Sequence, residues 1–513
     1  MSTSRFPTES AEQQRSPLAE LIALGLPAIV TMTSYTLMQF VDLWIVSKIG
    51  PEAVAGVGNG GIIAFMVIGV FFGLVSVIST FVSQNLGAGT PEHGAAYAWN
   101  GLYIAATGWL VIMLPVVLFF EPILVGIREL TQAVGLQSDD SNAAEIFRYQ
   151  LEYGRIMILG GVFTVAARAM AQFFYGLHKP QIVMVISVSA NLINVPISYA
   201  LVLGVWGMPE LGVAGAAIGT AIASAIEVTI PLLIFLSPKY ARDFGTRREW
   251  RPCLPVVRDI SRIGWPQALM MGNEILCWWI FMDMLVGRFG AAASAAGWIV
   301  LRYMHLSFMP AVGLSIAMTI VVGKLIGQGR RDLVQDRTRL GVLVTGLYMG
   351  IWAAIFVIFR EPLIAPFAGS AGSDSGVSAE AIIDIGAKLM IVAATFQVFD
   401  AIAIAISGSL RGAGDTVWPG AATVLLSWTC IVGMGYATIR FFPDWGPLGP
   451  WAAAAVYIFL LATAFGWRYL SGAWKKIDLL HRGPGSELPL IDDPTDPPVR
   501  AEDSSLEPER DPA

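Results

Sequence analysis

Apolar segments long enough to cross a lipid bilayer recur along the whole chain, separated by shorter stretches of polar residues, Gly and Pro. A membrane-spanning helix needs roughly 20 mostly apolar residues, and helical hydrogen bonding is required because lipid offers the backbone no partner. The pattern therefore predicts an all-α polytopic membrane protein with twelve transmembrane helices. The predicted spans are residues 18–47, 54–86, 97–119, 145–175, 182–204, 212–236, 258–287, 292–325, 340–359, 378–408, 418–440 and 449–471.

The second half of the chain repeats the first. The segment GLPAIVTM from Gly25 is echoed by GWPQALMM from Gly264, and SQNLGAGTPE at 83–92 is echoed by GKLIGQGRRD at 323–332. Both echoes run in the same direction, so the repeat is parallel, as in two-lobed transporters. The repeat predicts two six-helix lobes with one substrate path between them. The predicted organisation is a cytoplasmic tail at 1–17, lobes at 18–236 and 258–472, an inter-lobe loop at 237–257 and a tail at 473–513.

Composition and loop charge support this interpretation and orient it. With 55% hydrophobic and 14% charged residues, the chain is not a soluble globular protein. Basic residues concentrate in the loops that follow the even-numbered spans, at 239–258, 330–339 and 475–482. The positive-inside rule then places these loops and both termini in the cytoplasm. The loops after the third and ninth spans are less basic and hold Glu129, Asp139, Asp140, Asp374 and Glu380.

The formal net charge of −6 comes from the C-terminal tail, where residues 483–513 include nine acidic and two basic side chains. A Pro- and acid-rich segment of this kind cannot bury an apolar face, so we expect it to be disordered. The first residues are polar and lead into a full span, so no cleavable signal is expected. The three cysteines form no disulfide framework and suggest no metal site.

Among the carboxylates inside predicted spans, four are candidates for function: Asp42 in the first, Glu274 and Asp283 in the seventh, and Asp400 in the tenth. A charge at the bilayer centre costs about 2.5–3.5 kcal/mol even on insertion scales, so such residues usually face a cavity and function there. The alternatives are a position nearer the interface, as for Asp283, or a structural partner for a basic group. The acids can take up a proton, hold sodium or pair with an organic cation.

Polar and aromatic neighbours suit each of these ligands. Asn273 is next to Glu274, and Gln397 lies one turn before Asp400. Aromatic side chains on the same spans would favour a lipophilic cation through cation–π contact, although each alone is as well explained by packing or by contact with lipid. These aromatics are Trp278, Trp279, Phe396 and Phe399, and Tyr35 shares the first span with Asp42.

Several longer motifs resemble those of one transporter family. The segment SGSLRGAGDT at 407–416 resembles the signature of the multidrug and toxic compound extrusion (MATE) family. Three further segments resemble its first, fourth-to-fifth and eighth helices: FVDLWIVSKIGPEAVAGVG at 40–58, FFYGLHKPQIVMVISVSANLINV at 173–195 and FMPAVGLSIAMTIVVGKLIGQG at 308–329. The likeness is ordered along the chain and covers about residues 15–475.

The resemblance implies a monomeric exporter of the bacterial inner membrane, which exchanges sodium or protons for organic, often cationic, drugs. It needs no other cofactor and no nucleic acid, and it contacts membrane lipids. In the NorM-like branch the coupling cation binds acids on spans seven and ten, which match Glu274 and Asp400, with Asn273 and Gln397 as polar neighbours. In the DinF-like branch the acids lie on spans one and five. Asp42 matches the first, but Ser198 and its neighbours offer no acid at the second, which favours the NorM-like site.

On this hypothesis, a cation entering from outside neutralises Glu274 and Asp400 and releases a cationic substrate. The substrate-binding or proton-relay residues would be Asp42, Tyr35, Trp278, Phe396 and Phe399. Span eight departs from the family, with Gly297 and Trp298 where relatives often have a His-Gln pair, so substrate preference is expected to differ. We expect the lobes to move as rigid bodies about the loop at 237–257.

Other classes remain as alternatives. A flippase or exporter of a lipid-linked or other anionic precursor would need cationic side chains in the cavity, and Arg155, Arg168 and Arg302 lie in or near spans. A membrane-embedded enzyme would need a nucleophile–base or metal constellation, which the four scattered histidines do not provide. A nucleotide-driven pump is disfavoured because the chain has no Gly-x-x-x-x-Gly-Lys-Ser/Thr loop.

Overall fold

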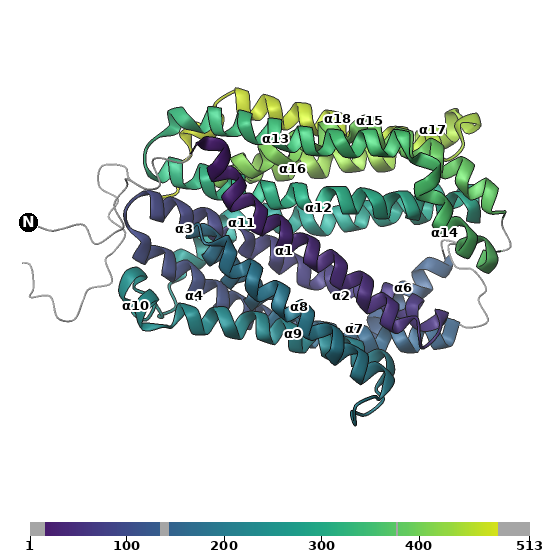
Figure 1. Ribbon diagram of the computed structural model, residues 1–513, viewed down its shortest axis with the longest axis horizontal. Coiled ribbons are helices and arrows are strands. Elements are labelled where there is room, and N and C mark those ends of the chain that lie inside the picture. Colours follow the sequence, from purple (N-terminus) through teal and green to yellow (C-terminus); the bar gives the residue numbers. More distant parts are fainter. Residues whose placement is uncertain (1–15, 134–142, 376–377, 481–513) are drawn as a thin grey trace, which may run out of the picture. The chain divides into compact units, whose positions relative to one another are not determined.

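The computed structural model describes residues 16–133, 143–375 and 378–480 (Figure 1). Residues 16–477 form one compact helical unit. Asp139, Asp140, nearly all of the N-terminal tail and the acidic segment from 483 lie outside the described residues. The predictions made for these parts of the chain therefore stay predictions.

Every regular element in the described residues is helical, and twelve helices or helix runs are long and apolar enough to cross a membrane, which confirms the predicted fold class. The first half contains α1 (Pro17–Val46), α2 (Pro51–Ser76), α3 (Ile78–Gly87), α4 (Pro91–Gly108), the π-helical η1 (Trp109–Met113), α5 (Leu114–Leu118), α6 (Phe120–Ala133), α7 (Ala143–Gly176), α8 (Pro180–Leu203) and α9 (Gly212–Phe235). Two of these spans are composite: α2 continues into α3, and α4 continues through η1 into α5.

The second half repeats this order after the short linker helix α10 (Pro238–Phe244). Its elements are α11 (Leu254–Trp279), the π-helical η2 (Ile280–Val286), η3 (Gly287–Phe289), α12 (Ala291–Gly327), α13 (Arg331–Ile358), α14 (Arg360–Ser375), α15 (Ala379–Gly412), α16 (Val417–Leu426), the π-helical η4 (Ser427–Met434), α17 (Gly435–Phe441), η5 (Pro443–Trp445), α18 (Leu448–Leu470) and η6 (Ala473–Lys476). The short helices α6 and α14 occupy equivalent places in the two halves, where the hydrophobic pattern predicts only loops.

Helix starts follow from local sequence. Prolines stand at the first helical position of α1, α2, α4 and α8, where the missing N–H would have no helical partner. Ser16 caps α1 by accepting a hydrogen bond from the backbone N–H of Ala19. Equivalent prolines, Pro27 and Pro266, lie inside the first helix of each half. The repeat seen in the sequence is thus a repeat of backbone features.

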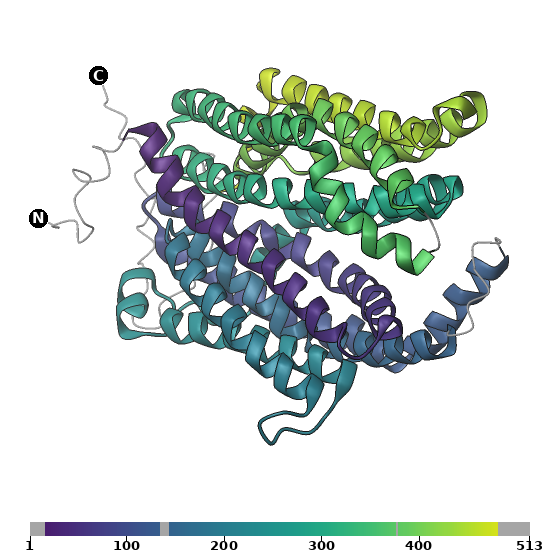
Figure 2. The ribbon, with the colours of Figure 1, turned by 45° about the vertical axis from the view of Figure 1, so that its right-hand side comes forward.

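Each half begins with a helix that packs on the other half. Helix α1 runs diagonally through the bundle in Figure 2 and packs against α8 of its own lobe and α12 of the second lobe. In the same way α11 packs against α2 of the first lobe. The lobes therefore contact each other through two equivalent crossings, α1 with α12 and α11 with α2.

Glycines allow very close approach at these crossings. A Cβ atom added to Gly313 would lie 2.7 Å from the backbone nitrogen of Ile29, and one added to Gly73 would overlap the backbone of Ala268. The two glycines are related by the repeat, being separated by 240 positions in the sequence. Backbone contact of this kind is the usual way that helices pack closely inside membranes.

A third contact joins the lobes at one end of the bundle, where α3 meets α12. Gly87 lies against the carbonyl group of Lys324, and Gly327 lies against that of Gln84, so neither position has room for a Cβ atom. These glycines are also equivalent in the two halves. The end of each lobe here is closed against the other by direct backbone contact.

Hydrogen bonds reinforce this closed end. Thr80 donates its hydroxyl to the carbonyl oxygen of Arg411 at 2.9 Å, and the amide of Gln84 donates to that of Gly412 at 2.9 Å. Both donors lie on α3 of the first lobe and both acceptors lie at the end of α15 in the second. The contact therefore combines steric fit with directional bonds to backbone carbonyls.

The inter-lobe linker is attached to the first lobe. The indole of Trp99 donates to the carbonyl oxygen of Thr246 at 2.7 Å, and the backbone N–H of Cys253 donates to Oδ1 of Asn100 at 3.0 Å. The hydroxyl of Tyr103 donates to the carbonyl oxygen of Trp250. Trp99, Asn100 and Tyr103 all lie on α4. The linker is therefore hydrogen-bonded to α4 as far as Cys253 and is not free along this stretch.

We expect the substitution Gly327→Ala to shift the lobes away from the arrangement seen here. The added methyl group overlaps the α3 backbone, and overpacking costs about 1–3 kcal/mol, a change of roughly 5- to 150-fold in a two-state population ratio. Electron paramagnetic resonance distances between labels at Arg248→Cys and Arg339→Cys would report the shift.

Gly346→Ala is the matched control, because Gly346 is also helical but has no neighbouring atom within 4 Å of the added Cβ. An unchanged distance distribution in the Gly327→Ala protein, or an equal shift in the control, would contradict the interpretation of the α3–α12 contact as a steric closure.

Candidate functional site

The second lobe brings together the two acids expected to bind the coupling ion. Glu274 lies on α11 and Asp400 on α15, close enough for their charges to interact. The Glu274 side chain is solvent-accessible and Asp400 is half-buried, so both acids remain open to a small ligand. The structure thus joins two carboxylates that are 126 positions apart in the sequence.

A tyrosine of α18 completes this acidic pair and was not predicted from the sequence. Tyr457 is 1% exposed, lies within electrostatic range of Glu274 and Asp400, and its buried hydroxyl has no hydrogen-bond partner in the described part of the chain. A buried hydroxyl without a partner is rare and costs free energy, so it indicates a position where a ligand or ion supplies the bond. Nothing in the local sequence of α18 marks this tyrosine.

The two amides expected beside the acids have other partners. Asn273 donates to the hydroxyl of Ser427 at 2.8 Å and accepts a bond from the indole of Trp428 at 2.8 Å, which ties α11 to η4. Gln397 donates to the hydroxyl of Ser307 at 3.1 Å, which ties α15 to α12. In this structure both amides therefore hold helices together, and their expected role as ion ligands stays a prediction.

The predicted aromatic residues are dispersed. Phe396 is 2% exposed and belongs to the core. Trp278 packs edge-on against Phe281, with ring centroids 5.3 Å apart, and Phe399 packs against Phe459 of α18 at 5.0 Å. Phe399 and Trp278 retain accessible surface, whereas Phe396 acts on its surroundings through packing.

Asp283, the weakest of the four acid candidates, lies exposed on the π-helical segment η2. Its exposure agrees with the alternative of a position nearer the interface.

In the first lobe Asp42 lies on α1 and contacts α9. Thr220 donates its hydroxyl to Oδ2 of Asp42 at 3.5 Å, whereas Oδ1 is buried without a partner in the described residues. Asn194 and Ser198 of α8 are fully buried, and their side-chain polar atoms also have no described partner. Carboxylate oxygens are ligands that hard cations prefer, so Asp42 is a second candidate position for a cation.

A further acid of the first lobe, Glu227, escaped the sequence analysis. Tyr35 donates its hydroxyl to Oε1 of Glu227 on α9 at 2.7 Å and lies 3.4 Å from the hydroxyl of Ser187 on α8. Its sequence signal was present: Glu227 is the acid within the apolar run 212–236.

Two acids, Asp42 and Glu227, therefore lie along the contact between α1 and α9. The pair Tyr35–Glu227 lies seven residues along each helix from the pair Asp42–Thr220, because the helices run antiparallel. At 1.5 Å per residue, this is a separation of about 10 Å along the axis. Glu227 lies nearer than Asp42 to the closed end of the lobes.

The motif at 407–416 has a structural role as well as a place in the lobe contact. Asp415, which is 4% exposed, accepts two bonds from Arg468 of α18, at 2.7 Å and 3.3 Å. Bidentate bonds of this kind satisfy a buried carboxylate and fix its geometry. They anchor the turn after α15 to α18.

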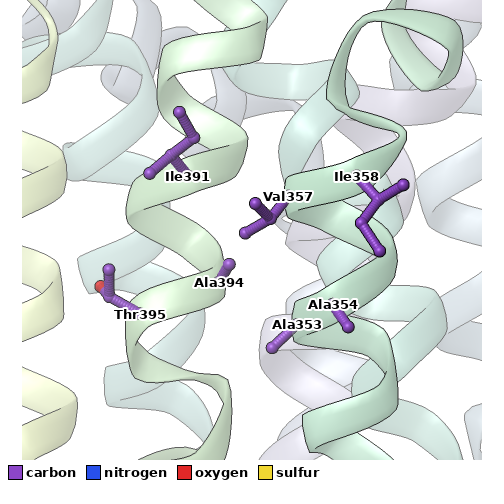
Figure 3. A pocket seen from close by; sticks show the side chains of 7 residues that line it. All are labelled: Ala353, Ala354, Val357, Ile358, Ile391, Ala394 and Thr395. Atoms are coloured by element: carbon purple, nitrogen blue, oxygen red, sulfur yellow. The ribbon is translucent and has the colours of Figure 1, made fainter.

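A surface groove of about 460 Å³ lies between α13 and α15 (Figure 3). Its lining is apolar apart from one threonine and includes none of the acids described above. Such a surface on a membrane-spanning bundle suits a lipid chain. The lining residues are Ala353, Ala354, Val357, Ile358, Ile391, Ala394 and Thr395.

The described residues contain no cluster of three or more His, Cys, Asp and Glu side chains that could hold a metal ion. All three cysteines are free, as the sequence predicts. A monovalent cation is a different case, because it can be held by two acids together with hydroxyl or carbonyl oxygens. In the described residues the second lobe offers such a set in Glu274, Asp400 and the hydroxyl of Tyr457.

Comparison with known proteins gives one family. The MatE family model matches residues 27–200 and 266–436, one segment in each lobe. The probable multidrug resistance protein NorM of Thermotoga maritima is 26% identical over 473 residues, which cover 91% of this chain and 96% of the relative. The protein of the same name from Pseudomonas aeruginosa is 28% identical over 479 residues, 92% and 93% of the two chains.

Solved structures agree in fold. An outward-facing multidrug resistance MATE family transporter of the MOP superfamily superposes with a TM-score of 0.79 at 19% identity, covering 92% of this chain and 100% of the other. The predictions of the family and of a transporter rather than an enzyme are both confirmed. The chain belongs to the MatE family of membrane transporters.

Proposed function

We propose that the protein is a secondary active antiporter that exports organic cations in exchange for sodium ions or protons by alternating access. The observation that carries this proposal is the placement of Asp42, Glu274 and Asp400 inside the membrane-spanning bundle, with acids on both lobes. The names of the relatives, which describe multidrug resistance proteins, support export of small organic compounds.

The acid pair of the second lobe is the proposed coupling site. Glu274 and Asp400 carry two negative charges near each other, a repulsion that a sodium ion or a proton relieves. The partnerless hydroxyl of Tyr457 offers a further oxygen. Binding of the coupling ion reduces the negative charge available to an organic cation, so the two ligands weaken each other by the same factor.

Asp42 is the proposed counterpart in the first lobe. Its Oδ1 has no hydrogen-bond partner in the described residues, and Thr220 supplies a hydroxyl group beside its Oδ2. An ammonium group of the substrate or a second coupling ion fits these ligands. Tyr35, which is hydrogen-bonded to Glu227, acts in substrate binding or proton relay.

Charge distribution supports a cytoplasmic location for the closed end. The α3–α12 contact lies next to loops that follow even-numbered spans, and these loops carry the excess of Lys and Arg. On this assignment both termini are cytoplasmic in a bacterial inner membrane, and the lobes are closed on the cytoplasmic side. We propose that the protein functions as a monomer in contact with membrane lipids.

Export of a lipid-linked or other anionic precursor is the second candidate, and its three arginines already have partners, with the guanidinium of Arg168 lying 5.8 Å from the ring centroid of Phe72. Arg155 pairs with Glu121 at 3.3 Å, and the guanidinium of Arg302 lies 5.6 Å from the ring centroid of Phe40. The acids on both lobes therefore favour a cationic group on the substrate.

Transport in liposomes tests the proposed exchange. The purified protein is reconstituted and uptake of a fluorescent organic cation is followed, first under a sodium gradient at clamped pH and then under a pH gradient without sodium. We expect uptake under one of the two gradients. No uptake of the cation under either gradient, together with uptake of an anionic analogue, would contradict the proposal and support export of an anionic substrate.

Glu274→Gln and Asp400→Asn should each lower ion-driven transport at least about tenfold, because loss of one charge removes the repulsion that the coupling ion relieves. Uptake rates at equal protein abundance measure the effect. Asp384→Asn is the matched control on the same helix as Asp400, since Asp384 is exposed and pairs with Lys388 at 2.7 Å. Wild-type rates in both acid variants would refute the coupling site.

Asn273→Ala should behave differently from its neighbour Glu274. Removing the amide leaves the partners on η4 unsatisfied, at a cost of about 1–3 kcal/mol, so the melting temperature falls. The response of transport to the driving ion should remain. A variant with wild-type melting temperature and altered ion response would instead assign Asn273 to the ion site.

A further inference from the structure

An exposed stripe of two arginines, a tryptophan and a leucine runs along α11, the first helix of the second lobe. Its members are Arg258, Arg262, Trp265 and Leu269, whose spacings of four, three and four positions place them on one helix face. Trp265 and Leu269 are each 50% exposed, and both arginines are exposed as well. At 1.5 Å per residue the stripe covers about 16 Å of the helix, with its basic part nearest the linker.

The stripe faces away from the first lobe. The opposite face of α11 packs on α2, where Gly264 lies against the backbone of Leu74 and Ala268 lies against Gly73. An α-helix turns once in about 3.6 residues, so the stripe is directed to the far side of α11 from this contact. On a membrane-spanning helix, such an exposed face is the one that lipid covers.

The positive charge of the stripe is not balanced by acidic side chains. Neither Arg258 nor Arg262 forms an ion pair within 4.0 Å with an acid in the described residues. Asp259, the acid next to Arg258 in the sequence, is within electrostatic range of Tyr97 on α4. A further exposed arginine, Arg251, lies in the linker just before α11. An anionic ligand would therefore find an excess of positive charge here.

The internal repeat shows that the fold does not require these arginines. Helix α1 is the equivalent of α11, and its two equivalent apolar positions are also exposed, Leu26 by 56% and Val30 by 37%. The positions equivalent to the arginines are alanines. The apolar part of the stripe is thus common to both halves, as contact with acyl chains demands, whereas the basic part is found on α11 alone of the two helices. The equivalent positions are Ala19 for Arg258, Ala23 for Arg262, Leu26 for Trp265 and Val30 for Leu269.

We propose that Arg258 and Arg262 bind the phosphate of an anionic phospholipid whose acyl chains lie along Trp265 and Leu269. Guanidinium groups bind phosphate oxygens through paired N–H donors, and tryptophan is favoured where the headgroups meet the hydrocarbon. A zwitterionic phospholipid would add a positive charge beside the arginines, so a headgroup with a net negative charge is preferred.

The proposed lipid is a ligand that stays in the membrane, so the site is independent of the transported compound and of the coupling ion. Only its leaflet depends on the orientation proposed above, which places this end of α11 at the negatively charged cytoplasmic surface. The lipid would contact the helix that forms one of the two crossings between the lobes, α11 with α2.

Native mass spectrometry of the full chain, titrated in detergent with phosphatidylglycerol or with phosphatidylcholine, tests the site. We expect the unmodified protein to bind phosphatidylglycerol more tightly. Arg258→Gln and Arg262→Gln should each weaken phosphatidylglycerol binding about fivefold and change phosphatidylcholine binding less than about twofold, since one basic side chain near the membrane surface contributes roughly this factor. Arg258→Lys, which keeps the charge, should retain most of the affinity.

The matched control for the double variant Arg258→Gln/Arg262→Gln is Arg242→Gln/Arg339→Gln, which removes two exposed charges from α10 and α13. Unchanged phosphatidylglycerol binding in the α11 variants, or an equal loss in the control, overturns the site. Inorganic phosphate should displace the lipid no more than chloride does at equal ionic strength. Stronger displacement would assign the arginines to a soluble anion and overturn the lipid assignment. Melting temperatures identify folding defects, and each single variant is an independent test if the other fails to fold.

Discussion

The hydrocarbon of a membrane offers no hydrogen-bond partner, and this constraint decides what each polar side chain in the bundle does. A polar group there must bond to another helix or face a path that water and ligands can enter. Asn273 and Gln397 take the first option and fasten neighbouring helices. Asp42 keeps a buried oxygen without a partner and Glu274 stays accessible, so we propose that both take the second option.

The same constraint explains why the lobes meet through glycine. Inside lipid there is no water from which helices could bury their apolar surface. Close packing and backbone contacts therefore supply the attraction between them. The equivalent positions Gly87 and Gly327 bring α3 and α12 together with no intervening side chain. A contact that depends on such close fit is either made or broken, which suits the proposed alternation between two discrete arrangements.

Length and hydrophobicity were sufficient to predict the twelve spans, because lipid makes the same demand on every one of them. The parallel repeat was equally visible, and the division into lobes that it predicts places Glu274 and Asp400 in the same lobe. The short helices α6 and α14 were missed because they lie outside long apolar runs. Glu227 was missed although it is an acid in such a run, so that signal was available and was overlooked.

Hydrogen-bond partners could not be predicted from the sequence. Asn273 bonds to a residue 154 positions away, and Gln397 bonds to one 90 positions away. The proximity of Tyr457 to both acids likewise depends on how α18 packs against α15. Such relations arise from the packing of distant helices, so a residue's neighbours in sequence, such as Asn273 for Glu274, are a poor guide to its neighbours in space.

The hydrogen bonds between the linker and α4 determine how the two halves of the chain are connected mechanically. Since the segment up to Cys253 is held on the first lobe, the peptide connection constrains the second lobe only at the start of α11. Everything else that relates the two halves is non-covalent. Mechanically, the two halves behave like two subunits that are joined by one peptide connection and are otherwise held together by non-covalent contacts.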